Sequence, residues 1–264
     1  MTTRPVGVFD SGIGGLSVLQ ALRADLPHQS FVYVADSGHS PYGERDPSHV
    51  IARARALTRY LREAHDIQTL VVACNTATAA AIHLLREENA DLPIVGLEPA
   101  LKPAALASQT HRVGVLATRG TLQSAKFQAL HQSLTEQADF VLRACDGLAD
   151  AIEHQDLPRI EALAREHVTA LGSCGAAKDQ IDTVVLGCTH YPLILPTLQA
   201  LLGPEVTLVE SGAPVARQTR RMLPQAAETG EPRVLWYTTG DAGELQTAVQ
   251  RWLQPQARVE TLRI

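Results

Sequence analysis

Two short stretches of the chain place a cysteine in similar chemical surroundings. Residues 71–78 read Val-Val-Ala-Cys-Asn-Thr-Ala-Thr, and residues 184–191 read Val-Val-Leu-Gly-Cys-Thr-His-Tyr. In each stretch a β-branched apolar run predicts a buried strand. Hydroxyl, amide or imidazole side chains follow the cysteine, and a helical pattern comes next in both. Cys74 and Cys188 are therefore the first candidates for chemistry.

A pair of thiols is suited to proton transfer at a stereocentre. One thiolate removes a proton from one face of a carbon, a thiol delivers a proton to the opposite face, and the two exchange roles in the reverse direction. A free thiol has a pKa of about 8.5, so a modest downward shift makes it a usable base near neutral pH. The start of a helix supplies such a shift. We therefore expect Cys74 and Cys188 to face each other across one small-molecule cleft, with Asp10 tuning the first thiol and His190 the second.

Other interpretations of the cysteines stay open. The Cys-x-His spacing of Cys188 and His190 could belong to a zinc site, although Cys74 has no partner at a standard zinc interval. A hydrolase would use Cys188 with His190 as its base and would leave Cys74 unexplained. A binding protein for acidic metabolites would need neither thiol. We expect Cys145 and Cys174 to be small, inert core residues.

The order of elements predicts an α/β fold. Strands alternate with helices of ten or more residues, which is typical of βαβ units and parallel sheets. Residues 6–9, Val-Gly-Val-Phe, are echoed by residues 113–116, Val-Gly-Val-Leu, so we expect two similar halves. Pro47 opens an amphipathic pattern that predicts a helix over 47–65. We also expect a helix from Cys145 to about His154.

We therefore predict two similar lobes, each a mainly parallel sheet flanked by helices, with the active site in the cleft between them. The first lobe comprises residues 1–97 plus 211–264 and contains Asp10 and Cys74. The second comprises residues 98–210 and contains the other cysteine motif. An edge strand near the end of the chain completes the first lobe.

Polar side chains gather at the predicted ends of the strands, where open parallel sheets bind their ligands. They are Asp10 with Ser11, Asp36 with Ser37, Cys74 with Asn75 and Thr76, Thr118 with Thr121, and Cys188 with Thr189 and His190. Each has a plainer interpretation. Asp10 and Asp36 could be helix N-caps, and His190 could be a satisfied core histidine.

Composition narrows the class of protein. The 264 residues are 45% apolar and 19% charged, as in soluble globular proteins. The net charge of -5 comes without a basic run, which argues against nucleic-acid binding. The start of the chain does not resemble a signal peptide, and no stretch is long and apolar enough to span a membrane. Together with four unclustered cysteines, these features predict a cytoplasmic protein with reduced thiols.

Several motifs, in order, closely resemble those of the glutamate racemase family. They lie at residues 8–18, 36–37 with 41–43, 73–77, 186–192 and 210–212, and the likeness extends from about residue 5 to about residue 220. The resemblance implies a cofactor-independent isomerase that interconverts L- and D-glutamate and supplies D-glutamate for peptidoglycan synthesis, cell wall biogenesis and cell shape. It also implies a cytoplasmic homodimer without a metal. A related two-cysteine racemase acting on aspartate, hydantoins or another small acid is the alternative.

The resemblance assigns Cys74 as the base toward D-glutamate and Cys188 as the base toward L-glutamate. Glu153 matches a family glutamate near the second cysteine, although Asp146 stands where the family commonly has proline. The implied catalytic set is Cys74, Cys188, Asp10, His190 and Glu153. The implied substrate-binding set is Asp10, Ser11, Tyr42, Gly43, Asn75, Thr76, Thr118, Thr121, Thr189 and His190.

No arginine or lysine lies within these motifs. We therefore expect backbone N–H groups, hydroxyls and helix N-termini to hold the two carboxylates of the substrate. The loop at residues 41–43 would grip the distal carboxylate.

Overall fold

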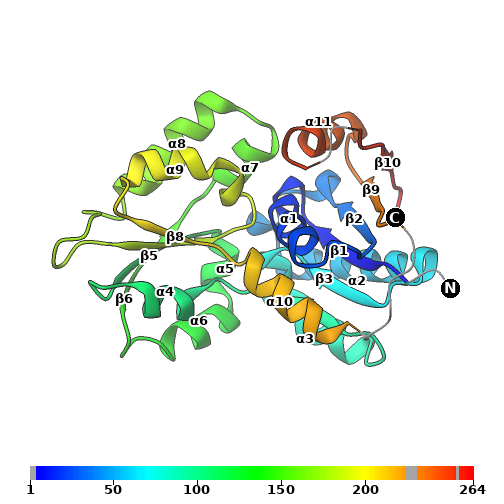
Figure 1. The fold of residues 1–264 in the computed structure, drawn as a ribbon, viewed down its shortest axis with the longest axis horizontal. Coiled ribbons are helices and arrows are strands. Elements are labelled where there is room, and N and C mark those ends of the chain that lie inside the picture. The colour runs from blue at the N-terminus through cyan, green and yellow to red at the C-terminus, as the bar shows by residue number, and fades with distance from the viewer. Residues whose placement is uncertain (1–3, 224–230, 254–255) are drawn as a thin grey trace. The chain divides into compact units, whose positions relative to one another are not determined.

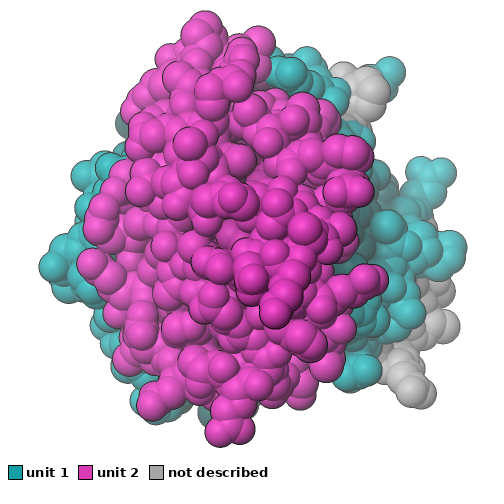
Figure 2. All heavy atoms as spheres, turned by 90° about the vertical axis from the view of Figure 1, so that its left-hand side faces the viewer, with its two compact units in different colours: residues 1–97, 212–264 teal, residues 98–211 magenta. Residues whose placement is uncertain are grey.

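The computed structural model describes residues 4–223, 231–253 and 256–264. The chain splits into two compact units, drawn in different colours in Figure 2: Met1–Leu97 with Gly212–Ile264, and Glu98–Ser211. Parts of the predicted first lobe, residues 1–3, 224–230 and 254–255, lie outside the described residues. Each unit has its own sheet.

The first unit is built on a six-stranded sheet of order β10-β9-β2-β1-β3-β4, in which every pair of neighbours is parallel. The strands, labelled in Figure 1 where there is room, are β1 (Val6–Asp10), β2 (Phe31–Ala35), β3 (Thr69–Val72), β4 (Ile94–Gly96), β9 (Val234–Thr238) and β10 (Val259–Thr261). The expected edge strand near the end of the chain is therefore present as β10. Its helices are α1 (Leu16–Asp25), α2 (Pro47–His65), α3 (Asn75–Glu88), α10 (Gly212–Met222) and α11 (Ala242–Trp252), with short 3-10 helices η1 (Ile13–Gly15), η2 (Ser37–His39) and η3 (Tyr42–Glu44).

Helices cover both faces of this sheet, which explains why its central strands are continuous apolar runs. Alternate side chains from β1, β2 and β3 pack with residues of α2 and α3 in one core cluster. On α2, Val50, Ala54, Leu57 and Leu61 form the buried stripe of an amphipathic helix. The predicted helix over 47–65 is confirmed, with Asp46 as its N-cap.

The second unit is built on a four-stranded parallel sheet of order β6-β5-β7-β8. Its strands are β5 (Arg112–Ala117), β6 (Asp139–Ala144), β7 (Thr183–Gly187) and β8 (Thr207–Val209). Its helices are α4 (Leu101–Ala107), α5 (Arg119–Gln123), α6 (Ala125–Gln132), α7 (Leu148–Glu153), α8 (Leu157–Thr169) and α9 (Leu195–Leu202), with a 3-10 helix η4 (Tyr191–Ile194). Within the described residues, no helix has both the length and the apolar character required to cross a membrane.

The two sheets share one topology. The order β2-β1-β3-β4 in the first unit matches β6-β5-β7-β8 in the second. The prediction of an α/β fold with two similar, mainly parallel halves is therefore confirmed. In this order the chain crosses to opposite sides of the first strand, so a crevice opens at the carboxyl ends of β1 and β3, and likewise of β5 and β7.

Two expected helix starts are wrong. The helix after Cys145 begins only at Leu148, because Gly147 precedes it with a left-handed φ of 75°. Cys188 does not open an α-helix either. The 3-10 helix η4 begins at Tyr191, and α9 begins at Leu195.

His167 is a buried, neutral residue of the second unit. Its side chain lies on α8, and the residue is 3% exposed. Its Nδ1 accepts a hydrogen bond from Arg143 Nε at 3.1 Å, and its Nε2 lies 3.2 Å from the carbonyl oxygen of Asp146. Burial is the main cause of a lowered pKa for His167, and the Arg143 charge adds to it, although the Asp146 carbonyl and the Glu166 carboxylate act in the opposite sense.

This lowered pKa predicts a loss of stability in mild acid. Below pH of about 6.5 the unfolded chain binds a proton at this histidine that the folded chain refuses, so the free energy of unfolding falls, by at most about 1.4 kcal/mol per pH unit. Urea unfolding between pH 5 and pH 8 measures the slope. His167→Gln should reduce the slope below pH of about 6.5. Equal slopes in the wild type and His167→Gln would contradict the assignment.

Candidate active site

The carboxyl edge of the first sheet brings three predicted residues together. Asp10 ends β1, Asp36 follows β2, and Cys74 follows β3, and these strands are neighbours in parallel register. Asp10 and Asp36 are fully buried, and Cys74 is 5% exposed. Buried carboxylates require hydrogen-bonding partners, so the contacts of these two define the site.

Cys74 is the N-cap of α3. Its backbone is extended, and its Sγ accepts a hydrogen bond from the backbone N–H of Ala77 at 3.4 Å. A sulfur in this position lies at the positive end of a 14-residue helix, which favours the thiolate over the thiol. The expectation that this cysteine opens a helix is confirmed.

Ser11 connects Asp10 to Cys74. The Asp10 Oδ1 atom accepts hydrogen bonds from the Ser11 backbone N–H at 2.6 Å and from Ser11 Oγ at 3.3 Å. Ser11 Oγ in turn lies 3.8 Å from Cys74 Sγ. Gly15 permits this arrangement, since a Cβ atom there would lie 2.6 Å from Asp10 Cβ. The carboxylate can therefore act on the thiol through the serine hydroxyl.

Asn75 and Thr76 occupy the first turn of α3, directly after the cysteine. Asn75 is 4% exposed, and its Oδ1 atom has no hydrogen-bond partner among the described residues. A buried amide oxygen without a partner costs about 1–3 kcal/mol. Such an acceptor is suited to a ligand donor, for example an ammonium group. Thr76 is 8% exposed beside it.

The loop that carries Tyr42 and Gly43 turns its tyrosine inward. Tyr42 is 1% exposed, and its hydroxyl donates to Asp36 Oδ2 at 2.5 Å. Asp36 precedes η2 but makes no side-chain cap, so its interpretation as an N-cap is wrong. Burial alone would raise the pKa of Asp36, but hydrogen bonds from Arg53, Tyr42 and Thr239 hold that pKa below its usual value.

In the second unit, Cys188 follows β7 and is 6% exposed. Gly187 lets β7 approach β5 closely at this point, because a Cβ atom there would lie 2.8 Å from Ala117 Cβ. Since η4 begins only at Tyr191, Cys188 does not lie at the N-terminus of an α-helix as expected. Its sulfur instead lies near the imidazole of His190.

His190 lies between Cys188 and Glu153. Its Nδ1 is 3.7 Å from Cys188 Sγ, and its Nε2 is 2.7 Å from Glu153 Oε2. The side chains of the histidine and the glutamate are only 3% and 8% exposed. Burial alone would lower the pKa of His190, but the hydrogen bonds to Cys188 and Glu153 raise it well above 6.5. The imidazole therefore favours its protonated form, between the Cys188 sulfur and the Glu153 carboxylate.

Three of the four threonines of the predicted set, Thr118, Thr121 and Thr189, lie at this edge of the second sheet. Thr118 follows β5 and caps α5, and its Oγ1 lies 2.9 Å from the Oγ1 of Thr121. Thr189 is 5% exposed, next to Cys188 in the chain. Arg119, in the same turn, is ion-paired with Asp146. The substrate-binding role of the three threonines stays a prediction.

The remaining cysteines favour the thiol form. Cys145 is 2% exposed, its Sγ donates to the carbonyl oxygen of Arg143 at 3.6 Å, and burial raises its pKa to about 12. Burial also raises the pKa of the half-buried Cys174. Both favour the protonated thiol. In the described part of the chain, no three His, Cys, Asp or Glu side chains cluster as metal ligands would.

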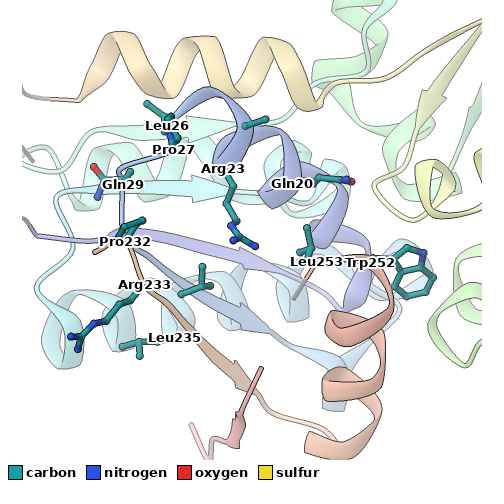
Figure 3. A pocket seen from close by; sticks show the side chains of 12 residues that line it. Gln20, Arg23, Leu26, Pro27, Gln29, Pro232, Arg233, Leu235, Trp252 and Leu253 are labelled. Carbon is teal, nitrogen blue, oxygen red and sulfur yellow. The ribbon is translucent and has the colours of Figure 1, made fainter. Parts of the chain in front are cut away.

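A pocket of about 680 Å³ in the first unit lies away from these residues. Figure 3 shows Arg23 of α1 pointing into it, with Trp252 and Leu253 at the end of α11 on one side. Its other walls come from the segment before β2 and from the start of β9. It therefore opens toward the amino ends of the strands, opposite the candidate site.

Sequence reasoning missed two residues that contact the site. Arg53 of α2 binds Asp36 through Nε and Nη2 at 2.9 and 2.8 Å, and Thr239 Oγ1 donates to the same carboxylate at 2.7 Å. Arg53 lies next to the buried stripe of α2, a position that ordinarily faces solvent. Thr239 comes about 200 residues after Asp36, and nothing local indicates the contact.

Two like α/β units, each with a hydrogen-bonded cysteine at a strand end, define an amino-acid racemase, which is an isomerase. The chain belongs to the Asp/Glu/hydantoin racemase family, whose sequence model matches residues 16–219. It is 45% identical over 261 residues to the glutamate racemase of Ectopseudomonas mendocina, covering 97% of both chains. It is 46% identical over 241 residues to that of Pseudomonas syringae pv. tomato, covering 90% of this chain and 86% of the relative.

Solved structures agree with this assignment. A glutamate racemase isoform from Bacillus anthracis superposes with a TM-score of 0.86 at 29% identity, over 100% of this chain and 99% of the other. The Escherichia coli glutamate racemase, solved in complex with L-glutamate and the activator UDP-MurNAc-ala, superposes with a TM-score of 0.83 at 31% identity over 98% of both chains.

The His190–Glu153 contact predicts a pH effect on racemisation. Glu153→Gln removes the carboxylate that holds His190 protonated, so the pKa of His190 falls and a thiolate at Cys188 loses stabilisation. We expect the turnover to fall about a hundredfold. The acidic limb of the pH–rate profile should move to higher pH, because the base then needs a higher pH to ionise.

The matched control is Glu166→Gln, which removes a carboxylate with a 61% exposed side chain that is paired with Arg143. It should leave both rate and profile near those of the wild type. A Glu153→Gln enzyme with an unshifted profile would show that the histidine does not act on the thiol.

Proposed function

We propose that the protein interconverts L- and D-glutamate by proton transfer at Cα between two cysteines, without a cofactor. The observation that carries this proposal is the matched position of Cys74 and Cys188, each at the end of the equivalent strand of its unit and each in contact with a polar side chain. The substrate is that of the curated relatives, which are glutamate racemases at 45–46% identity.

This mechanism requires the substrate Cα to lie between the two sulfurs. With L-glutamate, the Cys188 thiolate removes the Cα proton and the Cys74 thiol delivers a proton to the opposite face. The product is D-glutamate, with Cys188 now protonated and Cys74 ionised. D-glutamate enters this second state directly, and the same steps run in reverse.

Different groups adjoin the two sulfurs. The N-terminus of α3 and the Asp10–Ser11 pair adjoin Cys74, whereas the His190–Glu153 pair adjoins Cys188. Asp10 and His190 are therefore the proposed tuning groups. The difference supports a two-base mechanism, in which each sulfur must exist as thiol and as thiolate during one turnover.

The substrate's charged groups have partners at these edges. We assign its α-carboxylate to the backbone N–H groups at the start of α3, its ammonium group to the Asn75 Oδ1 and the Asp10 carboxylate, and its distal carboxylate to the backbone at Tyr42 and Gly43. Thr76, Thr118, Thr121 and Thr189 supply hydroxyls around it.

The D-glutamate formed would serve peptidoglycan synthesis, and thus cell wall biogenesis and cell shape, in the cytoplasm. We also propose a homodimer. Growth rescue of a D-glutamate auxotroph and light scattering of the purified protein test these two statements. The alternative substrate is aspartate, because the family model that matches residues 16–219 includes aspartate racemases.

Isotope exchange in heavy water tests the two-thiol mechanism. Cys74→Ala and Cys188→Ala should each lose full racemisation, by about 10²–10⁴-fold, since each removes one of the two proton carriers. Chiral chromatography with mass spectrometry of the substrate Cα–H position measures both racemisation and deuterium uptake.

Cys174→Ala is the control, because this half-buried cysteine lies outside both edges. It should racemise like the wild type. Full turnover by Cys74→Ala would overturn the mechanism and favour a hydrolase-like use of one thiol. A wild-type protein that incorporates no deuterium would indicate a binding protein.

A substrate comparison tests the specificity. We expect racemisation of glutamate with a kcat/KM at least about a hundredfold above that for aspartate, because an aspartate carboxylate stops one methylene short of the loop. Measurement of both D-amino acids with the same enzyme preparation decides the point. A preference for aspartate would identify the alternative.

A further inference from the structure

Asp36 is a fully buried carboxylate with four hydrogen-bond donors. Oδ1 accepts from Arg53 Nη2 at 2.8 Å and from Thr239 Oγ1 at 2.7 Å, and Oδ2 accepts from Arg53 Nε at 2.9 Å and from Tyr42 Oη at 2.5 Å. Arg53 binds it in the two-pronged geometry that arginine forms with carboxylates. The four bonds occupy the main acceptor positions of both oxygens.

The donors come from three separate segments of the first unit. Tyr42 belongs to the loop at η3, Arg53 to α2, and Thr239 to the turn after β9. The side chain of Arg53 is 12% exposed, and its Nη1 also donates to the carbonyl oxygen of Ile264 at 3.0 Å. Asp36 therefore ties the loop to a long helix and to the last strands of the sheet.

The tyrosine is the loop's connection to this network. Tyr42 and Cys74 belong to the same buried cluster, so the loop lies against the region of the proposed reacting sulfur. Because the Tyr42 hydroxyl is directed to Asp36, the backbone of Tyr42 and Gly43 is what the loop can offer to a ligand.

We propose that Arg53 and Asp36 are positioning residues, which hold the loop at Tyr42 and Gly43 where its backbone binds the distal carboxylate of the substrate. The proposal rests on the function proposed above. It assigns a role in the reaction to Arg53, a residue of α2 outside every motif of the site.

The same geometry argues against a proton-carrying role for Asp36. The carboxylate has no exposed surface, and its partners are a permanent cation and two hydroxyls. These hydrogen bonds hold its pKa below the usual value despite burial. Asp36 thus stays ionised at every pH at which a thiolate base works, and it acts only through the loop.

The test compares Arg53→Gln, Arg53→Lys and Tyr42→Phe with the wild type in the full-length protein. We expect Arg53→Gln and Tyr42→Phe to raise KM for glutamate at least about tenfold while kcat changes less than about threefold. Both variants weaken a binding contact that the substrate and the transition state make equally strongly. Arg53→Lys keeps the positive charge but loses the paired hydrogen bonds, so its KM should lie between those of the wild type and Arg53→Gln. Amide hydrogen exchange at residues 40–45 should accelerate in the same order.

Arg55→Gln is the matched control. Arg55 lies two residues away on α2 and pairs with Glu88 on the surface, where the two side chains are 44% and 40% exposed. Its KM and loop exchange should equal those of the wild type. Circular dichroism establishes that each variant is folded. If Arg53→Gln does not fold, Tyr42→Phe, which removes a single hydroxyl, decides the test.

Two results would overturn the proposal: folded variants with unchanged KM and unchanged loop exchange, or a fall in kcat with a shifted pH profile at constant KM. The second would make Asp36 a participant in proton transfer. A wild-type protein that does not racemise glutamate would instead remove the proposed function, while loop exchange would still report whether Arg53 anchors the loop.

Discussion

The crevice at the carboxyl ends of two neighbouring parallel strands is the constraint on which the site depends. In the order β2-β1-β3-β4 the connections leave the two central strands in opposite directions, so their ends stay open while helices cover both faces of the sheet. Asp10 and Cys74 occupy this place in the first unit, and Thr118 and Cys188 occupy it in the second. The same arrangement of strands occurs in both units, and in each it places a cysteine after the equivalent strand.

Two buried carboxylates of the structure are each compensated by a different partner. Asp36 is compensated by Arg53, and Glu153 by His190. Removal of one partner from such a pair is far more costly than the pair itself is stabilising, since the other charge stays in a low-dielectric interior. These pairs therefore fix geometry. One fixes a loop, and the other fixes the ring that contacts a sulfur.

Most of the fold could be predicted from the sequence, because continuous β-branched runs and one-sided helical stripes are local signals. The helix predicted from Pro47 to about His65 agrees with α2 (Pro47–His65). Predictions failed where a single backbone angle or a short 3-10 turn replaced a helix, as at Gly147 and after Cys188. Hydrophobic periodicity carries no information about either.

The site was predictable where motif and strand end coincide. It was not predictable where a side chain crosses the fold: Arg53 reads as a solvent-facing position of α2, and Asp36 reads as a cap. Only the tertiary structure reveals that the two meet. The His190–Glu153 contact was partly predictable. The family resemblance identified Glu153, but only the structure shows that its carboxylate contacts the histidine ring.

The first unit is discontinuous, since β9 joins the sheet beside β2 after the whole second unit has intervened in the chain. During synthesis β2 is therefore an unpaired edge for about 200 residues of translation, which is 10 s or more at about 5–20 residues per second. Thr239, which follows β9, is likewise synthesised only after the second unit. The nascent chain can complete the smaller sheet before the larger one, so the loop at Tyr42 and Gly43 acquires its last anchor only after the whole second unit has been synthesised.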